Sequence, residues 1–522
     1  MKINWWKNAV FYHIYPASFQ DSDGDGTGDI RGIINRLDYL TTLGIDAIWL
    51  SPVYRSPMID GGYDISDYRD IDPLFGTLDD FRELLKRAHD MGIRIMMDLV
   101  MNHTSDRHPW FIESRSSVDN LKRDWYIWRS GCNGKAPNNW RTNFFERAWR
   151  YDAITGQFYY HSFFRQQPDL NWRNEEMKRA FFENIRFWLD MGVDGFRLDV
   201  VNMLVKDRLF RNNRYRPFRK IIYNRNQPET CNIICEFRAL LDEYPGKASV
   251  GEVYVFRPGD PKLAASFLGS GDDMLNMAFD FSLIFCRWNA RKYYSAVQSY
   301  YDALPSAGWP CFFISNHDMG RSLNRFVPVR HAHEKARLIA VMLLTLKGTP
   351  FIYYGDELGM VNAHISRKQI RDRYGKKLWP VFSGRDRGRT PMQWDGSING
   401  GFTSGEPWLP LHKDFRRVNV EYEKADDNSV WNVYRKMIEL RKTQPALQQG
   451  EIEFIETGYK GVLAYSRTLD NHQIWIALNF SSRKQAFIKF PQNSIILFST
   501  HRKIAENNEK RLLPFEAIVI TE

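Results

Sequence analysis

Acidic residues and histidines recur in this chain at the points where short apolar runs end. Asp199 closes the run GFRLDV, Glu252 lies in GEVY, and Asp318 follows His317 in SNHD. One acidic residue after a strand is usually a helix cap, but capping does not explain the same placement at successive strand ends. Such an array suits glycoside cleavage, in which one carboxylate attacks the anomeric carbon and a protonated acid assists the leaving oxygen.

The spacing of these residues assigns them separate roles. The two carboxyl groups of a retaining glycosidase lie ~5–5.5 Å apart, and adjacent strands of a barrel lie ~4.8 Å apart. Asp199 and Glu252 on neighbouring strands meet this requirement as nucleophile and general acid/base. Arg197 precedes Asp199 by two residues, so it shares that side of the strand and favours ionised Asp199. Glu252 needs a raised pKa from burial and nearby negative charge, and Asp318 is expected to stabilise the transition state.

Eight apolar runs alternate with amphipathic stretches, a pattern typical of a parallel sheet covered by helices. Eight strands are the number that a closed (β/α)8 TIM barrel requires, and its catalytic residues lie at the carboxyl ends of the strands. The predicted strands are Val10–Tyr15, Ala47–Leu50, Arg94–Val100, Gly195–Val200, Ser249–Val253, Met277–Phe281, Phe312–Ser315 and Pro350–Tyr354.

The intervals between these strands predict the domain organisation. The third and fourth strands are separated by far more than one helix, which indicates an inserted domain. A helix over Val430–Leu447 is expected to close the barrel, and the residues after it alternate in polarity as in an antiparallel β domain. The predicted parts are the barrel (residues 1–101 and 172–447), inserted domain B (102–171), a short insertion (361–408) and a C-terminal β domain (448–522).

Together these motifs resemble the α-amylase family of glycoside hydrolases over nearly the whole chain. The segments similar to its four shared regions are Asp98–His103, Gly195–Asp199, Glu252 and Asn316–Asp318. The run Gln167–Asn171 resembles a further region that marks the oligo-1,6-glucosidase and α-glucosidase branch. The resemblance implies the barrel with both added domains, retaining hydrolysis of α-glucosides, and the catalytic roles given above.

The resemblance also implies a set of substrate-binding residues. Those that hold the glucose at the cleavage point are Asp64, His103, Arg197 and His317, with Tyr63 as the stacking aromatic. Arg389 in GRTPMQWD is expected to pair with Asp64 and close the pocket around the non-reducing end. A pocket closed in this way makes the enzyme exo-acting.

Linkage preference depends on Val200 and on the segment Val361–Asp386. In related enzymes a valine after the nucleophile accompanies α-1,6 substrates and a threonine accompanies α-1,4 substrates, so we expect α-1,6 preference with some α-1,4 activity. The alternative is that Val200 is an ordinary β-branched strand residue. The segment Val361–Asp386 is shorter than in typical oligo-1,6-glucosidases and contains RDRYG, more like other bacterial α-glucosidases.

An acidic loop near the start of the chain has the spacing of a calcium site. Oxygen-bearing residues stand at its odd positions and Gly26 at position 6. Position 12 is Gly32, so the loop is not an EF-hand, and a solvated turn is the alternative. Related α-glucosidases bind Ca²⁺ here, sometimes Mg²⁺, which implies a structural ion. The predicted ligands are Asp21, Asp23, Asp25, Thr27 (through its carbonyl) and Asp29.

Composition narrows the partners and the location. The chain has 522 residues and a net charge of +10, without a block of five basic residues, which argues against nucleic-acid binding. No apolar stretch reaches membrane-spanning length, and Met1–Phe11 lacks the apolar core of a signal peptide. Five scattered cysteines indicate free thiols in a reducing compartment. We therefore expect a cytoplasmic protein whose partner is a small oligosaccharide or disaccharide.

Several related activities remain open at this stage. A transglycosylase or sucrose isomerase would share the catalytic residues, although the arginine-rich isomerising motif is not evident in Gly320–Arg330. A trehalose-6-phosphate hydrolase would need a basic pocket for the phosphate. A non-catalytic transporter subunit would carry a membrane anchor and lack the full set of carboxylates, the reverse of this chain.

Overall fold

The computed structural model describes residues 4–214, 222–255, 259–326, 330–486, 494–501 and 511–522. Eight parallel strands form a closed barrel in the order β1-β13-β12-β11-β10-β9-β5-β2. They are β1 (Phe11–Ile14), β2 (Ala47–Leu50), β5 (Arg94–Leu99), β9 (Gly195–Leu198), β10 (Ala248–Glu252), β11 (Met277–Phe279), β12 (Cys311–Phe313) and β13 (Thr349–Tyr353). Each overlaps one of the predicted strands, so the predicted barrel is confirmed.

Large side chains fill the barrel beneath its carboxyl-terminal end, as expected for a packed TIM barrel. Phe11, Trp49, Phe279 and Phe351 belong to one buried cluster, in which the rings of Phe11 and Phe351 stack at 4.5 Å. This aromatic layer forms a rigid base for the polar residues at the strand ends.

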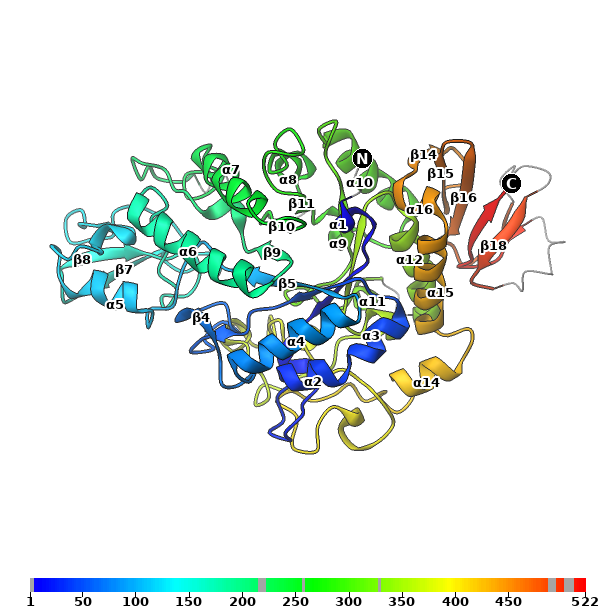
Figure 1. The fold of residues 1–522 in the computed structure, drawn as a ribbon, viewed down its shortest axis with the longest axis horizontal. Coiled ribbons are helices and arrows are strands. Elements are labelled where there is room, and N and C mark those ends of the chain that lie inside the picture. Colours follow the sequence, from blue (N-terminus) through cyan, green and yellow to red (C-terminus); the bar gives the residue numbers. More distant parts are fainter. Residues whose placement is uncertain (1–3, 215–221, 256–258, 327–329, 487–493, 502–510) are drawn as a thin grey trace.

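Helices cover the outside of the barrel (Figure 1). The longer ones are α3 (Leu37–Leu43), α4 (Leu78–Asp90), α6 (Glu175–Met191), α7 (Glu229–Asp242), α10 (Ala290–Ala303), α12 (Ala332–Thr345) and α15 (Val430–Thr443). Helix α4 begins with a capping box between Thr77 and Asp80, in which each side chain binds the other residue's backbone N–H. Helix α6 begins at Asn174 and ends at Gly192, whose φ of 110° is the left-handed conformation favourable to glycine.

The predicted helix Val430–Leu447 is wrong at its C-terminal end. Helix α15 stops at Thr443, and Pro445 begins the separate helix α16 (Pro445–Gln449). Proline forces the preceding residue out of the helical region, and Gln444 is accordingly extended, with φ −113° and ψ 96°. Because Pro445 is the first residue of α16, its missing N–H leaves no backbone acceptor unsatisfied there.

Two additions flank the barrel at opposite ends of the molecule (Figure 1). The predicted insertion after the third barrel strand contains α5 (Pro109–Ser116) and a sheet with the order β6-β8-β7; its strands are β6 (Trp128–Arg129), β7 (Trp149–Asp152) and β8 (Gln157–Tyr160). The C-terminal sheet has the order β14-β15-β16-β20-β18 and is antiparallel, as predicted. Its strands are β14 (Glu451–Ile455), β15 (Val462–Leu469), β16 (His472–Asn479), β18 (Ile495–Ser499) and β20 (Ala517–Thr521). The exact domain boundaries stay a prediction.

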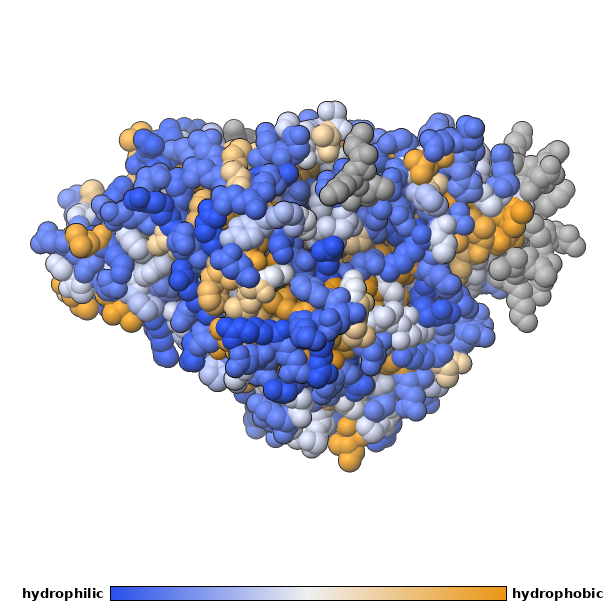
Figure 2. All heavy atoms as spheres, in the orientation of Figure 1, coloured by the Kyte–Doolittle hydropathy of each residue, from blue (hydrophilic) through white to orange (hydrophobic). Residues whose placement is uncertain are grey.

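The remaining short elements lie mainly in the connections. They are α1 (Trp5–Asn8), α2 (Ile30–Asn35), β3 (Tyr54–Arg55), β4 (Asp67–Ile71), α8 (Pro261–Ser266), α9 (Ser282–Phe285), α11 (Ser322–Arg325), α13 (Arg373–Leu378), α14 (Val420–Ala425), β17 (Gln485–Ala486) and β19 (Arg511–Leu512). The face in Figure 2 is mostly hydrophilic, with apolar side chains in small groups. Within the described ranges, every helix is too short or too polar to cross a lipid bilayer.

Candidate active site

Three neighbouring strands bring the predicted nucleophile and acid/base together around one arginine. Asp98 on β5 lies opposite Arg197 on β9, and Gly251 on β10 lies opposite Leu198, so Glu252 adjoins Asp199. Arg197 donates to Asp98 and Asp199, each at 2.8 Å, and to Glu252 at 2.5 Å. The guanidinium is 1% exposed, so all three ion pairs are shielded from water. The sequence-based expectation that Arg197 binds Asp199 therefore agrees with the structure.

Burial raises the pKa of both catalytic carboxyl groups, while the shared arginine opposes the shift. Burial raises the pKa of Asp199 well above its ordinary value, with Arg197 opposing the shift and Glu252 adding to it. Burial likewise raises the pKa of Glu252, Arg197 opposes it, and the charge of Asp318 raises it further. Two carboxylates this close repel each other when both are ionised, while Arg197 stabilises one negative charge. The two carboxyl groups therefore titrate as a coupled pair, and burial favours the protonated form of each.

Asp318, in contrast, lies among positive charges. Burial alone would raise its pKa, but His317, Arg385 and Arg389 together lower it well below the ordinary value. Arg389 donates to Asp318 at 3.0 Å and Arg385 does so at 3.3 Å. Its side chain is 34% exposed, more open than those of Asp199 and Glu252. Asp318 is therefore an ionised carboxylate facing the more accessible part of the site.

Two aromatic rings line the same space. The phenol of Tyr63 donates to Asp98 at 2.9 Å, and its ring stacks on His317 with 5.2 Å between centroids. Burial lowers the pKa of His317 to about 3, so its imidazole is neutral at physiological pH. The indole of Trp49 also donates to Asp98, which accordingly orients both Arg197 and Tyr63. The structure thus places Tyr63 and His317 beside the carboxylates, as predicted.

His103 is tied to the loop that carries Tyr63. Its Nε2 lies 3.1 Å from the carbonyl oxygen of Tyr63 and 3.1 Å from the amide nitrogen of Gln167. Burial lowers the pKa of His103, which favours the neutral imidazole. The amide of Gln167 also donates to Asp60 at 3.1 Å. This chain of contacts connects the insertion to the loop after β3.

The expected pair of Asp64 and Arg389 is wrong. The Asp64 carboxylate is fully buried and accepts the backbone N–H groups of Ile59 and Asp60, each at 2.9 Å. Arg389 donates instead to Asp318 and to the carbonyl oxygen of His317. Because its oxygens bind backbone, Asp64 fixes the shape of a turn, and burial raises its pKa to about 6.

The ion pair that spans the loops is formed by Asp60 and Arg385. Arg385 donates to Asp60 at 2.6 Å, to Asp372 at 3.0 Å and to Asp318 at 3.3 Å. It therefore joins the loop after β3 and the segment after β13 to the carboxylate that follows β12. The sequence analysis missed Arg385 and Asp60. The available signal was the additional arginine that stands four residues before Arg389, at the start of GRDRGR.

Known proteins with this arrangement settle the family. Residues 13–450 match the family description "Alpha amylase, catalytic domain". The chain belongs to the α-amylase family. It is 41% identical to the oligo-1,6-glucosidase of Parageobacillus thermoglucosidasius, with 99% of this chain and 98% of that protein aligned.

Two solved structures of the family have the same fold over their whole length. The α-glucosyl transfer enzyme XgtA superposes with a TM-score of 0.93 at 38% identity, covering 100% of both chains. The trehalulose synthase MutB of Pseudomonas mesoacidophila MX-45 superposes with a TM-score of 0.92 at 35% identity, covering 99% of both chains. This chain is therefore a family glycoside hydrolase whose relatives include hydrolysing and glucosyl-transferring enzymes.

Val200 does not belong to a strand, contrary to the prediction. Strand β9 ends at Leu198, and Val200 has a φ of 39°, a left-handed conformation that is strained for a β-branched residue. Its side chain is buried with Phe163 and Met203, and Phe144 and Tyr254 pack against that cluster. Val200 thus lines an apolar patch beside the nucleophile, between the barrel and the insertion.

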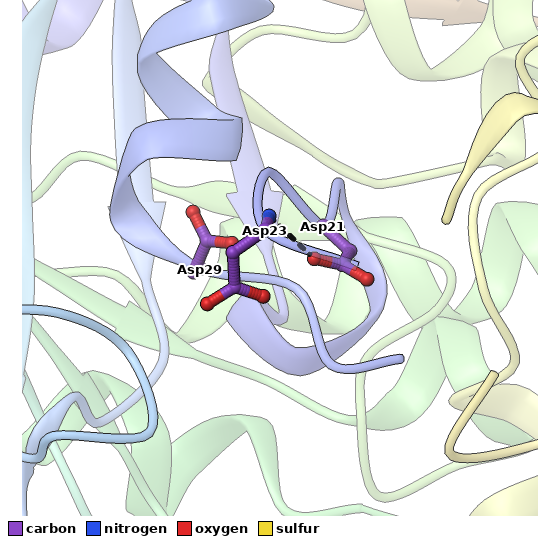
Figure 3. Close-up of side chains that lie close together, drawn as sticks. All are labelled: Asp21, Asp23 and Asp29. Carbon is purple, nitrogen blue, oxygen red and sulfur yellow. Dashed lines mark hydrogen bonds between the residues drawn. The ribbon is translucent and has the colours of Figure 1, made fainter. Parts of the chain in front are cut away.

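The acidic loop gathers three of its five predicted ligands (Figure 3). Oxygens of Asp21, Asp23 and Asp29 lie within 4.8 Å of one another, a spacing that fits a hard cation. Asp25 is not part of this group, and its carboxylate accepts the backbone N–H of Thr27. The Asp21 carboxylate also accepts the Thr403 hydroxyl and the Gly24 N–H, so it fastens the loop to the segment after β13.

Proposed function

We propose that this protein is a retaining, exo-acting α-glucosidase that releases glucose from the non-reducing end of short α-glucosides. The favoured substrates are α-1,6-linked isomalto-oligosaccharides, with some α-1,4 activity. One observation carries the proposal: Asp199 and Glu252 adjoin on neighbouring strands and share Arg197, and burial raises the pKa of both carboxyl groups.

In the proposed chemistry Glu252 begins the cycle protonated and Asp199 begins it ionised. Ionised Asp199 attacks the anomeric carbon and forms a glucosyl ester, while Glu252 protonates the leaving oxygen. Glu252, now ionised, then accepts a proton from a water molecule, whose oxygen attacks the anomeric carbon and releases Asp199. Asp318 remains ionised throughout because Arg385 and Arg389 donate to it, and it stabilises the positive charge that develops on the sugar.

Exo action is supported by the Asp60–Arg385 pair. The guanidinium binds three carboxylates from different loops, which favours a closed and rigid end to the pocket. A blind pocket of this kind accepts one terminal glucose. Glucose and a trisaccharide are then the first products from isomaltotetraose and maltotetraose, measured by chromatography at low conversion. Early release of disaccharide from the non-reducing end, or rapid clearing of starch, contradicts the closed pocket.

Rescue of the inactive variants by azide distinguishes the nucleophile from the general acid/base. With an activated α-glucoside, Asp199→Ala is expected to lose several orders of magnitude in turnover and, with added azide, to yield β-glucosyl azide. Glu252→Ala retains the nucleophile, so azide attacks the covalent intermediate and yields α-glucosyl azide. Asp190→Ala, at an exposed aspartate, serves as the matched control. Near-normal activity of Asp199→Ala, or the reverse pair of products, refutes the assignment.

Glucosyl transfer is a second candidate, favoured by the similarity to XgtA and to trehalulose synthase. Part of the segment Gly320–Arg330, in which the isomerising motif is not evident, lies outside the described residues, because 327–329 are not described. Incubation with sucrose decides between the reactions. Hydrolysis yields equal glucose and fructose, whereas isomerisation yields a new, reducing disaccharide of glucose and fructose without net release of either monosaccharide. Adding trehalose 6-phosphate to the same panel tests the phosphorylated alternative.

We further propose a structural Ca²⁺ at Asp21, Asp23 and Asp29, with Mg²⁺ as the alternative ion. Carboxylate oxygens are the ligands that both ions prefer, and the three side chains converge without the ion. The loop contacts the segment after β13 through Thr403, which supports a stabilising role. A cytoplasmic location is also proposed, supported by five unpaired cysteines, and cell fractionation tests it.

A further inference from the structure

A cavity of about 470 Å³ lies between the insertion and the loop after β9. Tyr126, Ile127 and Arg129 line it from the insertion, and Lys206, Arg208 and Phe210 line it from the loop. Cavities of roughly 300–1,000 Å³ between structural units are the usual places for small-molecule sites. None of the three proposed catalytic carboxylates lines this cavity, so it is separate from the active site.

Arg129 is a fixed cation without a carboxylate partner. Its guanidinium lies 4.2 Å from the centre of the Phe210 ring and donates to the carbonyl oxygen of Trp128 at 2.8 Å. Within the described ranges, no carboxylate oxygen lies within 4.0 Å of it. Partial burial lowers the pKa of Arg129, and the charge of Asp124 opposes this shift. An arginine held in this way has planar donors free for a ligand.

The other cations around the cavity outnumber their partners. Arg173 and Arg208 both bind the single carboxylate of Glu229, at 3.0 Å and 3.1 Å. Lys206 is buried and paired with Asp169 at 2.5 Å. The cations are then four (Arg129, Arg173, Lys206 and Arg208), and the anions are three (Glu229, Asp169 and the rim residue Asp124). One positive charge is therefore in excess. The cavity is therefore suited to an anion.

We propose that this cavity is a second ligand site that binds a phosphate-bearing molecule of hexose size. Arginine donates to phosphate oxygens in a fork geometry, which places the phosphate beside Arg129 and Arg208. Asp124 and Asn171 at the rim offer oxygen acceptors for sugar hydroxyls. The shared chemistry is the phosphate group, whether on a hexose or free.

Calorimetric titration with glucose 6-phosphate, glucose and inorganic phosphate tests the site in the full-length protein. Wild type and Arg150→Gln, at an exposed arginine of β7 outside the cavity, are expected to bind one glucose 6-phosphate per chain. Arg129→Gln is expected to bind it about tenfold more weakly or worse, because a hydrogen bond to a charged group is lost. Arg208→Gln, whose side chain is 73% exposed and therefore dispensable for folding, provides a second test.

The outcomes separate the possibilities cleanly. If glucose 6-phosphate binds more tightly than inorganic phosphate, the ligand is a sugar phosphate. If the two bind with equal affinity, the ligand is free phosphate. Either result supports the proposed site. Unchanged turnover of an α-glucoside by the variants shows that the catalytic pocket is intact. The proposal is overturned if neither phosphate compound binds, if glucose binds as well as its phosphate, or if both arginine variants bind like wild type.

Discussion

Glu357 is a buried acid whose protonation should make stability depend on pH. It follows β13, is fully buried, and its Oε1 accepts the hydroxyls of Tyr12 and Tyr39, each at 2.7 Å. Its other oxygen, Oε2, has no hydrogen-bond partner among the residues that the structure describes. Burial raises the pKa of Glu357 from 4.5 to about 7, against the two tyrosine hydrogen bonds, which lower it. Glu357→Gln keeps the acceptor and removes the titration.

The size of the effect follows from proton linkage. Because the folded pKa lies above the unfolded one, the folded state binds the proton more tightly. The stabilisation is complete below pH 4.5 and is lost as the pH rises through about 7. Between pH 5 and pH 8 this costs roughly 2–3 kcal/mol. With an unfolding entropy of about 2 cal/mol/K per residue, the loss corresponds to a melting shift of roughly 2–3 °C in a chain of this length.

Melting temperatures at pH 5 and pH 8 check this reasoning. Wild type should lose roughly 2–3 °C more than Glu357→Gln over that interval. The exposed residue Glu421 supplies the matched control, and Glu421→Gln should retain the wild-type dependence. Parallel melting curves for wild type and Glu357→Gln at all pH values would refute the buried neutral acid.

Three further predictions concern the insertion, the acidic loop and the linkage. Lys206→Met leaves Asp169 without its buried cation and should lower the free energy of unfolding, measured in urea, by about 3–5 kcal/mol. Lys262→Met, at an exposed lysine, is the control and should leave that free energy unchanged. Equal losses in the two variants would exclude the ion pair as the cause. A chelator should lower the melting temperature of wild type but not of Asp23→Asn, with little change in initial rate; no shift in wild type means no structural ion. Wild type should prefer isomaltose to maltose. Val200→Thr should move the ratio of kcat/KM for the two disaccharides several-fold toward maltose, because the threonine hydroxyl gains about 1 kcal/mol from one hydrogen bond to the sugar. A wild type that prefers maltose, together with an unchanged ratio in the variant, contradicts this role of Val200.

The barrel and the catalytic cluster could be predicted because their signals are local. Each barrel strand is a short apolar run, and the closed parallel arrangement brings all carboxyl ends to one face. Arg197, Asp199 and Glu252 lie at the ends of β9 and β10, so their proximity follows from strand order alone. The register of the strands then fixes which side chains meet.

Backbone conformations outside regular elements were less predictable. The left-handed turn at Val200 contradicts the preference of a β-branched residue, so no local rule predicts it. It is maintained by the surroundings: the N–H of Asp199 binds the carbonyl oxygen of Leu99, and the Val200 side chain is packed with Phe163. Strain of this kind persists only where tertiary contacts determine the local structure.

The closed end of the pocket shows why a motif identifies residues without fixing their partners. Asp60 and Asp64 both stand in one acidic turn, and Arg385 and Arg389 both stand in one basic segment, so four pairings are compatible with the sequence. Asp64 is excluded because its oxygens accept two backbone N–H groups of its own turn. That hydrogen bonding shapes the turn that presents Asp60, which is then free to bind a guanidinium from a segment 325 residues away. The choice of partner is thus decided by the local folding of a loop, and Asp64 acts on the pocket through Asp60.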